Sequence, residues 1–147
     1  MGRRYRYLEK RTICRMILVD TTVWIDFFLG KPCSYVVFLE KAINDNENLC
    51  VNGVILSEIL QGIRSEKDYK KTKAHFESLI YLPILKTTYI SAADIYRSLR
   101  KKGITIRNTI DCVIAANAME HNIPLLHNDK DFDNIEKNSG LKTIYLL

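Results

Sequence analysis

The chain contains no apolar run long enough to cross a bilayer. Its basic N-terminus is not followed by the apolar core and small-residue cleavage site of a signal peptide, so we expect no export. None of the four cysteines forms a C-x-x-C pair: they are Cys14, Cys33, Cys50 and Cys112. Three of them have apolar neighbours, and we expect reduced thiols in a cytoplasmic protein rather than disulfides or a cysteine-bound metal.

Net positive charge is missing from most of the chain, although the net charge of the whole chain at pH 7 is +5. Six of the 22 basic residues and one of the 17 acidic residues lie in residues 1–15, so residues 16–147 hold 16 of each and are neutral. We therefore divide the chain into a basic leader, residues 1–15, and a single domain, residues 16–147. The leader is either an upstream translation start or an arm that contacts nucleic acid. Its sequence is also compatible with a disordered segment.

Internal repeats and low-complexity segments are also absent, and from Met16 short apolar runs alternate with amphipathic stretches. Strands are predicted at residues 16–20, 48–52, 81–85, 124–128 and 142–147. Helices are predicted at residues 21–30, 31–46, 53–63, 66–78, 87–103 and 108–122, with a loop and a short helix in 129–140. Strands separated by helices require crossover connections, so the fold class is α/β, with a mostly parallel sheet covered on both faces.

Four acids map to one edge of this sheet. Asp20 ends the first strand, Asp111 lies in the first turn of a helix, and Asp129 follows the strand at 124–128. Glu58 lies in the apolar helix after the second strand. Ordinary alternatives remain open for each, such as a helix cap for Asp20 or a turn residue for Asp129. Ligands of open α/β sheets bind beyond the carboxyl ends of the strands, where all four acids are expected.

Gathered carboxylates repel one another, and burial raises their pKa values, so a cation is needed to keep them ionised together. Ligation by oxygen alone is preferred by Mg²⁺ or Mn²⁺, and the lack of histidine and cysteine in the set argues against zinc. Such ions activate water and stabilise charge in phosphoryl transfer. The sequence therefore predicts a magnesium- or manganese-dependent enzyme that hydrolyses phosphodiester bonds.

Several accessory residues are candidates. Thr21 or Thr22 could bond water or a phosphate oxygen at the site, or simply cap the helix. Asn117, one and a half turns after Asp111, could face the same site. A basic cluster brackets the approach to Asp111 and is either a substrate rim or a solvated helix end: Arg97, Arg100, Lys101, Lys102 and Arg107.

The chain from Met16 onward resembles the PIN-domain ribonucleases, specifically the VapC-type toxins of toxin–antitoxin pairs. The resemblance rests on "ILVDTTVWIDFFLG", "VILSEILQGI", "TIDCVIAANAMEHNIPLLHND" and "DKDF". It implies a three-layer α/β/α sandwich and Mg²⁺- or Mn²⁺-dependent endonucleolytic cleavage of structured RNA, such as tRNA or rRNA. It assigns the metal-binding acids to Asp20, Glu58, Asp111 and Asp129, with Thr21 as an accessory hydroxyl. Within "NDKDFDN", Asp131 or Asp133 could replace or supplement Asp129.

The resemblance also implies a homodimer and a cognate antitoxin protein as partners. The sequence favours an interface formed by an apolar cluster, namely Trp24, Phe27, Phe28, Tyr35, Val37 and Phe38. Two alternatives to the nuclease remain. One is a catalytically silent PIN-like binding module. The other is an aspartyl phosphatase, which requires a second Asp where this chain has Thr22.

Overall fold

The computed structural model describes residues 5–6 and 16–146, so Cys14 and most of the basic leader lie outside the described residues. The described strands are β1 (Tyr5–Arg6), β2 (Met16–Val19), β3 (Asn48–Asn52), β4 (Ile80–Leu82), β5 (Leu125–Leu126) and β6 (Ile144–Tyr145). The described helices are α1 (Thr21–Phe28), α2 (Ser34–Asn44), α3 (Gly53–Gln61), α4 (Glu66–Glu77), α5 (Lys86–Lys101), α6 (Thr109–Glu120) and α7 (Lys130–Asn138).

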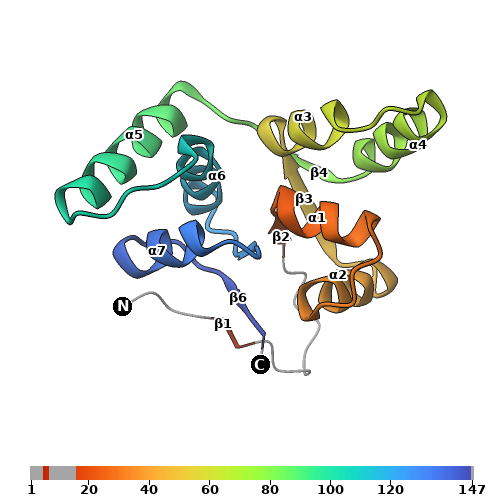
Figure 1. Ribbon diagram of the computed structural model, residues 1–147, viewed down its shortest axis with the longest axis horizontal. Coiled ribbons are helices and arrows are strands. Elements are labelled where there is room, and N and C mark those ends of the chain that lie inside the picture. Colours follow the sequence, from red (N-terminus) through yellow and green to blue (C-terminus); the bar gives the residue numbers. More distant parts are fainter. Residues whose placement is uncertain (1–4, 7–15, 147) are drawn as a thin grey trace.

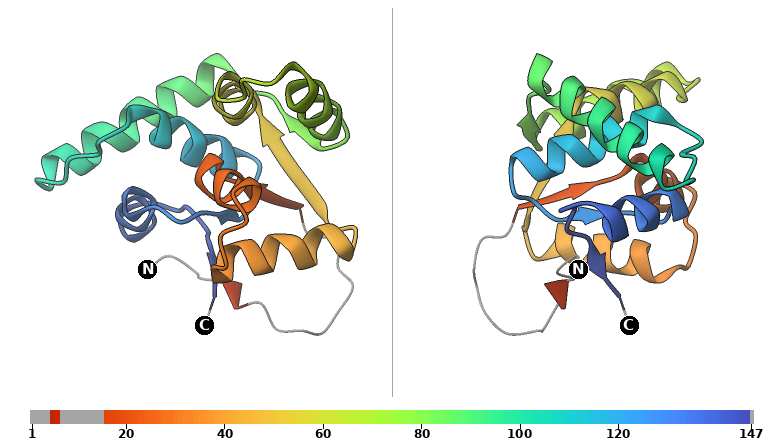
Figure 2. Two further views of the ribbon diagram at one scale, coloured as in Figure 1. Left: turned by 45° about the vertical axis from the view of Figure 1, so that its right-hand side comes forward. Right: turned by 90° about the vertical axis from the view of Figure 1, so that its left-hand side faces the viewer.

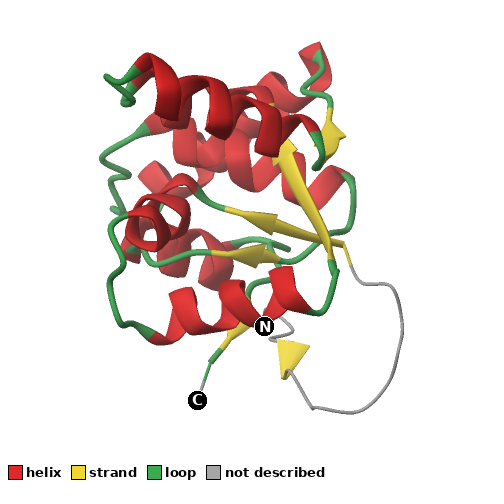
Figure 3. Cartoon of the chain, turned by 90° about the vertical axis from the view of Figure 1, so that its right-hand side faces the viewer, coloured by secondary structure: helices red, strands yellow, loops and turns green. Residues whose placement is uncertain are grey.

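The main sheet has the strand order β4-β3-β2-β5, and every pairing in it is parallel. Its central strand β2 is apolar along its length, with Ile17, Leu18 and Val19 buried. A continuous apolar strand is the pattern expected where helices cover both faces of a sheet. Figure 3 shows these strands running between helices that lie above and below them. The predicted three-layer α/β/α fold is confirmed.

The helices fall into two groups. In Figure 1, α1 to α4 lie on one side of the molecule and α5 to α7 on the other. Gly30 and Gly103 follow α1 and α5 with positive φ angles of 68° and 75°, a conformation that glycine adopts without steric cost. Both glycines were predicted to end these helices.

Four helices, α1, α3, α6 and α7, begin at the carboxyl edge of the sheet. Asp20 directly follows β2 and caps α1, accepting a hydrogen bond from the Thr22 N–H. Asn52 ends β3 and caps α3, with 2.9 Å between its Oδ1 and the Ile55 nitrogen. Asn108 caps α6, and Asp129 caps α7. Each cap supplies a partner for a backbone donor that the helix leaves unpaired.

Several predicted strands differ from the structure, and β5 covers only Leu125–Leu126 of the predicted 124–128. The edge strand β4 ends at Leu82, before Pro83, because proline has no N–H to donate to the ladder. The final strand β6 pairs with β1 in a separate two-stranded sheet, and one isolated bridge joins Leu125 and Thr143. Figure 2 shows this pair at the end of the molecule where the C-terminus lies. Part of the leader is thus a strand, which its basic sequence did not indicate.

The aromatic cluster that predicted an interface is divided between core and surface. Trp24 is fully buried, with its ring centroid 4.8 Å from that of Phe76, so its assignment to an interface was wrong. Phe28 and Val37 are 47% and 59% exposed and remain available for contacts. Cys33, Cys50 and Cys112 are free thiols. No helix among the described residues is long and apolar enough to span a membrane.

Candidate active site

Asp20 lies between the central strand β2 and α1, where it caps the helix and places a carboxylate at the edge of the sheet. Its Oδ2 accepts hydrogen bonds from the Thr22 hydroxyl at 2.6 Å and from the Thr22 N–H at 3.2 Å. Burial raises the pKa of Asp20 to about 6, against the lowering effect of the Thr22 bonds. The residue is therefore a helix cap whose carboxylate is also held rigidly at the sheet edge.

Glu58 approaches from α3. Its Oε1 accepts a hydrogen bond of 2.9 Å from the Thr21 hydroxyl. Thr21 was one of two threonines considered for contact with water or a phosphate oxygen, and in the structure its hydroxyl holds the carboxylate of Glu58 beside the start of α1. The bond joins α1 to α3 through two residues that lie 37 positions apart in sequence.

Asp111 lies in the first turn of α6 and is buried. Burial raises its pKa to about 7, and the negative charges of Asp20, Asp129, Asp131 and Glu58 add to the effect. A first-turn acid near a helix N-terminus is ordinarily stabilised in its ionised form. At Asp111, desolvation and repulsion by the other carboxylates outweigh this stabilisation, as expected where several carboxylates converge.

The start of α7 contributes two acids, Asp129 and Asp131. The Asp131 N–H donates to Asp129 Oδ1 at 2.9 Å, and the Arg107 N–H donates to Asp131 Oδ2 at 3.1 Å. The Arg107 side chain contacts both carboxylates, with Nη2 3.2 Å from Asp129 Oδ1 and Nε 3.5 Å from Asp131 Oδ2. On the other side, His127 Nδ1 accepts the Asp129 N–H at 3.1 Å.

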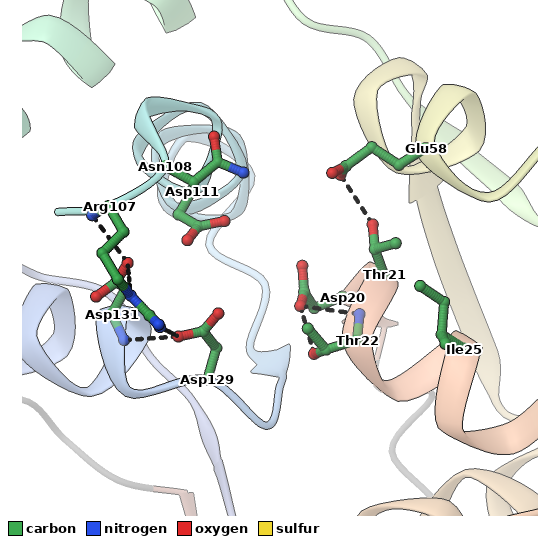
Figure 4. A pocket seen from close by; sticks show the side chains of 10 residues that line it. All are labelled: Asp20, Thr21, Thr22, Ile25, Glu58, Arg107, Asn108, Asp111, Asp129 and Asp131. Carbon is green, nitrogen blue, oxygen red and sulfur yellow. Dashed lines mark hydrogen bonds and ion pairs between the residues drawn. The ribbon is translucent and has the colours of Figure 1, made fainter. Parts of the chain in front are cut away.

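These groups line one pocket of about 330 Å³ (Figure 4). The carboxylates of Asp20, Asp111 and Asp129 point toward its middle, from three different elements of the chain. The complete lining consists of Asp20, Thr21, Thr22, Ile25, Glu58, Arg107, Asn108, Asp111, Asp129 and Asp131. The structure thus brings together all four acids singled out in the sequence, and with them Asp131, which the sequence offered as a replacement for or supplement to Asp129.

The pocket fits a divalent cation. Asp111, Asp129 and Asp131 each offer a carboxylate oxygen, and the three oxygens lie within 4.8 Å of one another. This donor set is the kind that Mg²⁺ and Mn²⁺ prefer. The raised pKa values of Asp20 and Asp111 also fit, because a bound cation would relieve the repulsion that contributes to them.

Asn117 does not line this pocket, so its predicted place was wrong. It is fully buried, with its Oδ1 accepting from Asn52 Nδ2 at 3.0 Å and its Nδ2 donating to the Pro83 carbonyl at 3.1 Å. A buried amide needs such partners, and these join α6 to the start of α3. Asp133 also lies outside the pocket, with a half-exposed side chain 3.9 Å from His127 Nε2.

Of the five predicted basic residues, Arg107 alone is among the described residues that line the pocket. Arg97 lies 3.8 Å from Asp94, and Arg100 lies over the ring of Tyr96. Lys102 Nζ donates to Asn138. Arg97, Arg100 and Lys101 belong to the last turns of α5, and Lys102 follows them. Sequence reasoning missed His127, although its position two residues before Asp129 was a visible signal.

Comparisons with known proteins agree with this geometry. The model of a family described as the PIN domain matches residues 17–138. The chain is 32% identical over 133 residues to VapC ribonuclease Mb1587 of Mycobacterium bovis, covering 86% of this chain and 96% of the relative. It is also 32% identical over 127 residues to ribonuclease VapC of Rickettsia bellii, covering 81% and 90% of the two chains.

Solved structures show the same fold. A chain in the crystal structure of VapBC2 from Rickettsia felis bound to a promoter DNA fragment matches with a TM-score of 0.69 and 20% identity, covering 87% of this chain and 96% of the other. A chain in the structure of FitAcB from Neisseria gonorrhoeae matches with a TM-score of 0.66 and 22% identity, covering 88% and 97%.

Proposed function

This chain belongs to the PIN domain family, among relatives named VapC ribonucleases, and on that premise we propose that it is the ribonuclease toxin of a toxin–antitoxin pair. In finer terms, we propose a Mg²⁺- or Mn²⁺-dependent endoribonuclease that cuts structured RNA, such as tRNA or rRNA. The observation that carries the proposal is the convergence of five acids from distant parts of the chain in one pocket.

The acids have distinct parts in this proposal. Asp111, Asp129 and Asp131 would hold the cation, with Asp20 and Glu58 facing them across the pocket. When bound, the cation would activate water and stabilise the charge that develops on the phosphate. Thr22 and Thr21 hold the carboxylates of Asp20 and Glu58 in fixed positions, so these groups need little reorganisation when substrate binds. Arg107 and Asn108 lie at the same pocket and are suited to a phosphate oxygen.

The proposed partners are an RNA substrate, a second copy of this chain and a cognate antitoxin protein. The antitoxin is supported by the similarity of this chain to chains in VapBC2 from Rickettsia felis and in a toxin–antitoxin complex from Klebsiella pneumoniae. The free thiols of Cys33, Cys50 and Cys112 suit action in the cytoplasm.

The alternatives fit less well. In an aspartyl phosphatase, the residue two positions after Asp20 would be an acid, whereas Thr22 has no proton of suitable acidity and donates its hydroxyl to Asp20. A silent binding module would have no need for five mutually repelling carboxylates in one pocket, since such a cluster is costly without a cation.

The proposal is tested by incubating the purified protein with total RNA in Mg²⁺, in Mn²⁺ and in a chelator, and mapping the cut ends. We expect cleavage at discrete sites with either ion and none in the chelator. Cleavage that persists in the chelator would contradict the metal dependence, while a lack of cleavage under all conditions would favour the silent module.

A further inference from the structure

Arg107 is the one basic residue among the described residues that line the acidic pocket, and it is placed there by its own backbone. Its N–H donates to Asp131 Oδ2, which anchors the residue at the pocket wall whatever its side chain does. The side chain itself is 75% exposed. A guanidinium that is well solvated can leave a carboxylate more readily than a buried one, because water and salt screen the exposed ion pair and make it weak.

The guanidinium bridges two of the three acids that could hold a cation. Nη2 contacts Asp129 Oδ1 and Nε contacts Asp131 Oδ2. Among the described contacts of Arg107, none is to the third acid, Asp111. Both contacted oxygens already accept a backbone hydrogen bond. A divalent cation that binds Asp129 and Asp131 would therefore meet the guanidinium at the same pair of carboxylates.

We propose that Arg107 is a built-in counter-ion of Asp129 and Asp131, and that a divalent cation displaces its side chain from them. The inference rests on the proposed metal-dependent function. A cation of charge +2 neutralises the two carboxylates without the guanidinium, and close positive charges repel. The displaced side chain stays tethered at the pocket mouth beside Asn108, where it can contact an RNA phosphate. Metal binding and substrate binding are then coupled through one side chain.

If Arg107 instead helped to hold the metal site, its removal would change the metal affinity in the opposite direction. If the cation took the carboxylate oxygens that Arg107 leaves free, the guanidinium would remain and hold both acids in place for the ion. Removing the side chain would then weaken metal binding. If Arg107 competes with the cation, removing it strengthens metal binding.

The test compares Mn²⁺ affinities of the full-length wild type, Arg107→Gln and Lys130→Gln by the paramagnetic resonance signal of the free ion. Lys130 is the matched control, because it lies between the two acids in sequence but is exposed and does not line the pocket. At 0.15 M salt we expect Arg107→Gln to bind Mn²⁺ about three- to tenfold more tightly than the wild type. Lys130→Gln should differ from the wild type by less than about twofold, because exposed charges are screened.

A second measurement does not depend on the variant's stability. In wild-type protein, the Nε–H nuclear magnetic resonance signal of Arg107 should shift toward that of a solvated arginine as diamagnetic Mg²⁺ is added. A third variant separates charge from geometry. Arg107→Lys keeps the charge but cannot bridge both carboxylates, so its Mn²⁺ affinity should lie between those of the wild type and Arg107→Gln.

Three outcomes would overturn the inference: an unchanged or weaker Mn²⁺ affinity in Arg107→Gln, an equal gain in Lys130→Gln, or an Nε–H signal that Mg²⁺ leaves in place. A wild type that binds neither ion would instead contradict the proposed function, and the inference with it.

Discussion

At the scale of single residues, the buried acids of the pocket are the most informative groups. Burial and repulsion raise the pKa of Asp111 to about 7, and burial raises that of Asp20 to about 6. Although Asp20 also caps α1, keeping either carboxylate ionised costs the fold stability. Such groups are typical of sites selected for chemistry rather than for stability.

The raised pKa of Asp111 predicts how stability depends on pH in the presence of a chelator. Its ordinary pKa is 3.8, so between about pH 4 and pH 7 the folded chain holds a proton that the unfolded chain has released. Its contribution is fully present below pH 4 and is lost as the pH rises through 7. Asp111→Asn removes this loss, so we expect the variant to equal the wild type near pH 4 and to exceed it at pH 8, by on the order of 2 kcal/mol.

Thermal melts of both proteins at several pH values measure this difference. Asp94→Asn is the control, because Asp94 is exposed and distant in sequence from the pocket residues. A constant difference between Asp111→Asn and the wild type from pH 4 to pH 8 would show that Asp111 does not titrate in this window.

The sequence was sufficient to gather the four acids but not to resolve the start of α7. Asp20 and Asp129 follow strands, and Asp111 opens a helix, so parallel topology alone places them at one edge. The choice among Asp129, Asp131 and Asp133 depends on where α7 begins and how it packs. With Asp129 as its cap, Asp131 turns toward Arg107, while Asp133 lies beside His127. No local spacing reveals such contacts between distant segments.

At the scale of elements, periodic helices and buried strands were predictable, whereas short pairings were not. The helix at 87–103 was predicted within two residues of α5, because its amphipathic pattern is long and Gly103 ends it. The two-residue strand β1 has no alternating pattern to detect, and its partner β6 pairs outside the main sheet. The domain boundary at Met16 thus stays a prediction, and the pairing of β1 with β6 crosses it.

Removal of residues 1–15 tests this boundary. We expect a chain that starts at Met16 to fold and to cut RNA at the same sites, because the main sheet and all the pocket residues lie within 16–146. The loss of the β1–β6 pairing should lower the melting temperature only slightly. If the leader contacts RNA, the truncation should also weaken binding and flatten its salt dependence. Failure to fold would show that the leader belongs to the domain.

At the scale of the whole molecule, exposed apolar side chains on α1 and α2 suggest an assembly. Ile25, Phe28, Leu29 and Val37 are all at least 43% exposed, whereas the neighbouring Trp24 is buried. Scattered exposed apolar residues are ordinary, but several on adjoining helices suggest a contact surface. This set replaces the one inferred from sequence, which could not separate the buried face of α1 from the exposed one.

We therefore predict a homodimer at micromolar concentration that uses this surface. Val37→Glu should shift the solution mass toward the monomer, because it introduces a charge at the surface while leaving the core intact. Glu40→Gln, on the exposed face of the same helix, should leave the mass unchanged. Light scattering across a concentration series measures both. A wild type with a monomeric mass throughout would contradict the dimer, and a dimeric Val37→Glu would show that another surface forms it.

The central claim is that the acidic pocket is a metal-dependent nuclease centre, and Asp20→Asn tests it most directly. The change keeps the shape of the side chain and an oxygen that can cap α1. Cleavage of RNA in Mg²⁺ should fall by about a thousandfold or more, because such ions supply several kcal/mol of transition-state stabilisation. Melting in a chelator should show equal or greater stability, because one member of a repelling cluster has been neutralised. A folded Asp20→Asn protein that cuts RNA at the wild-type rate would contradict the claim.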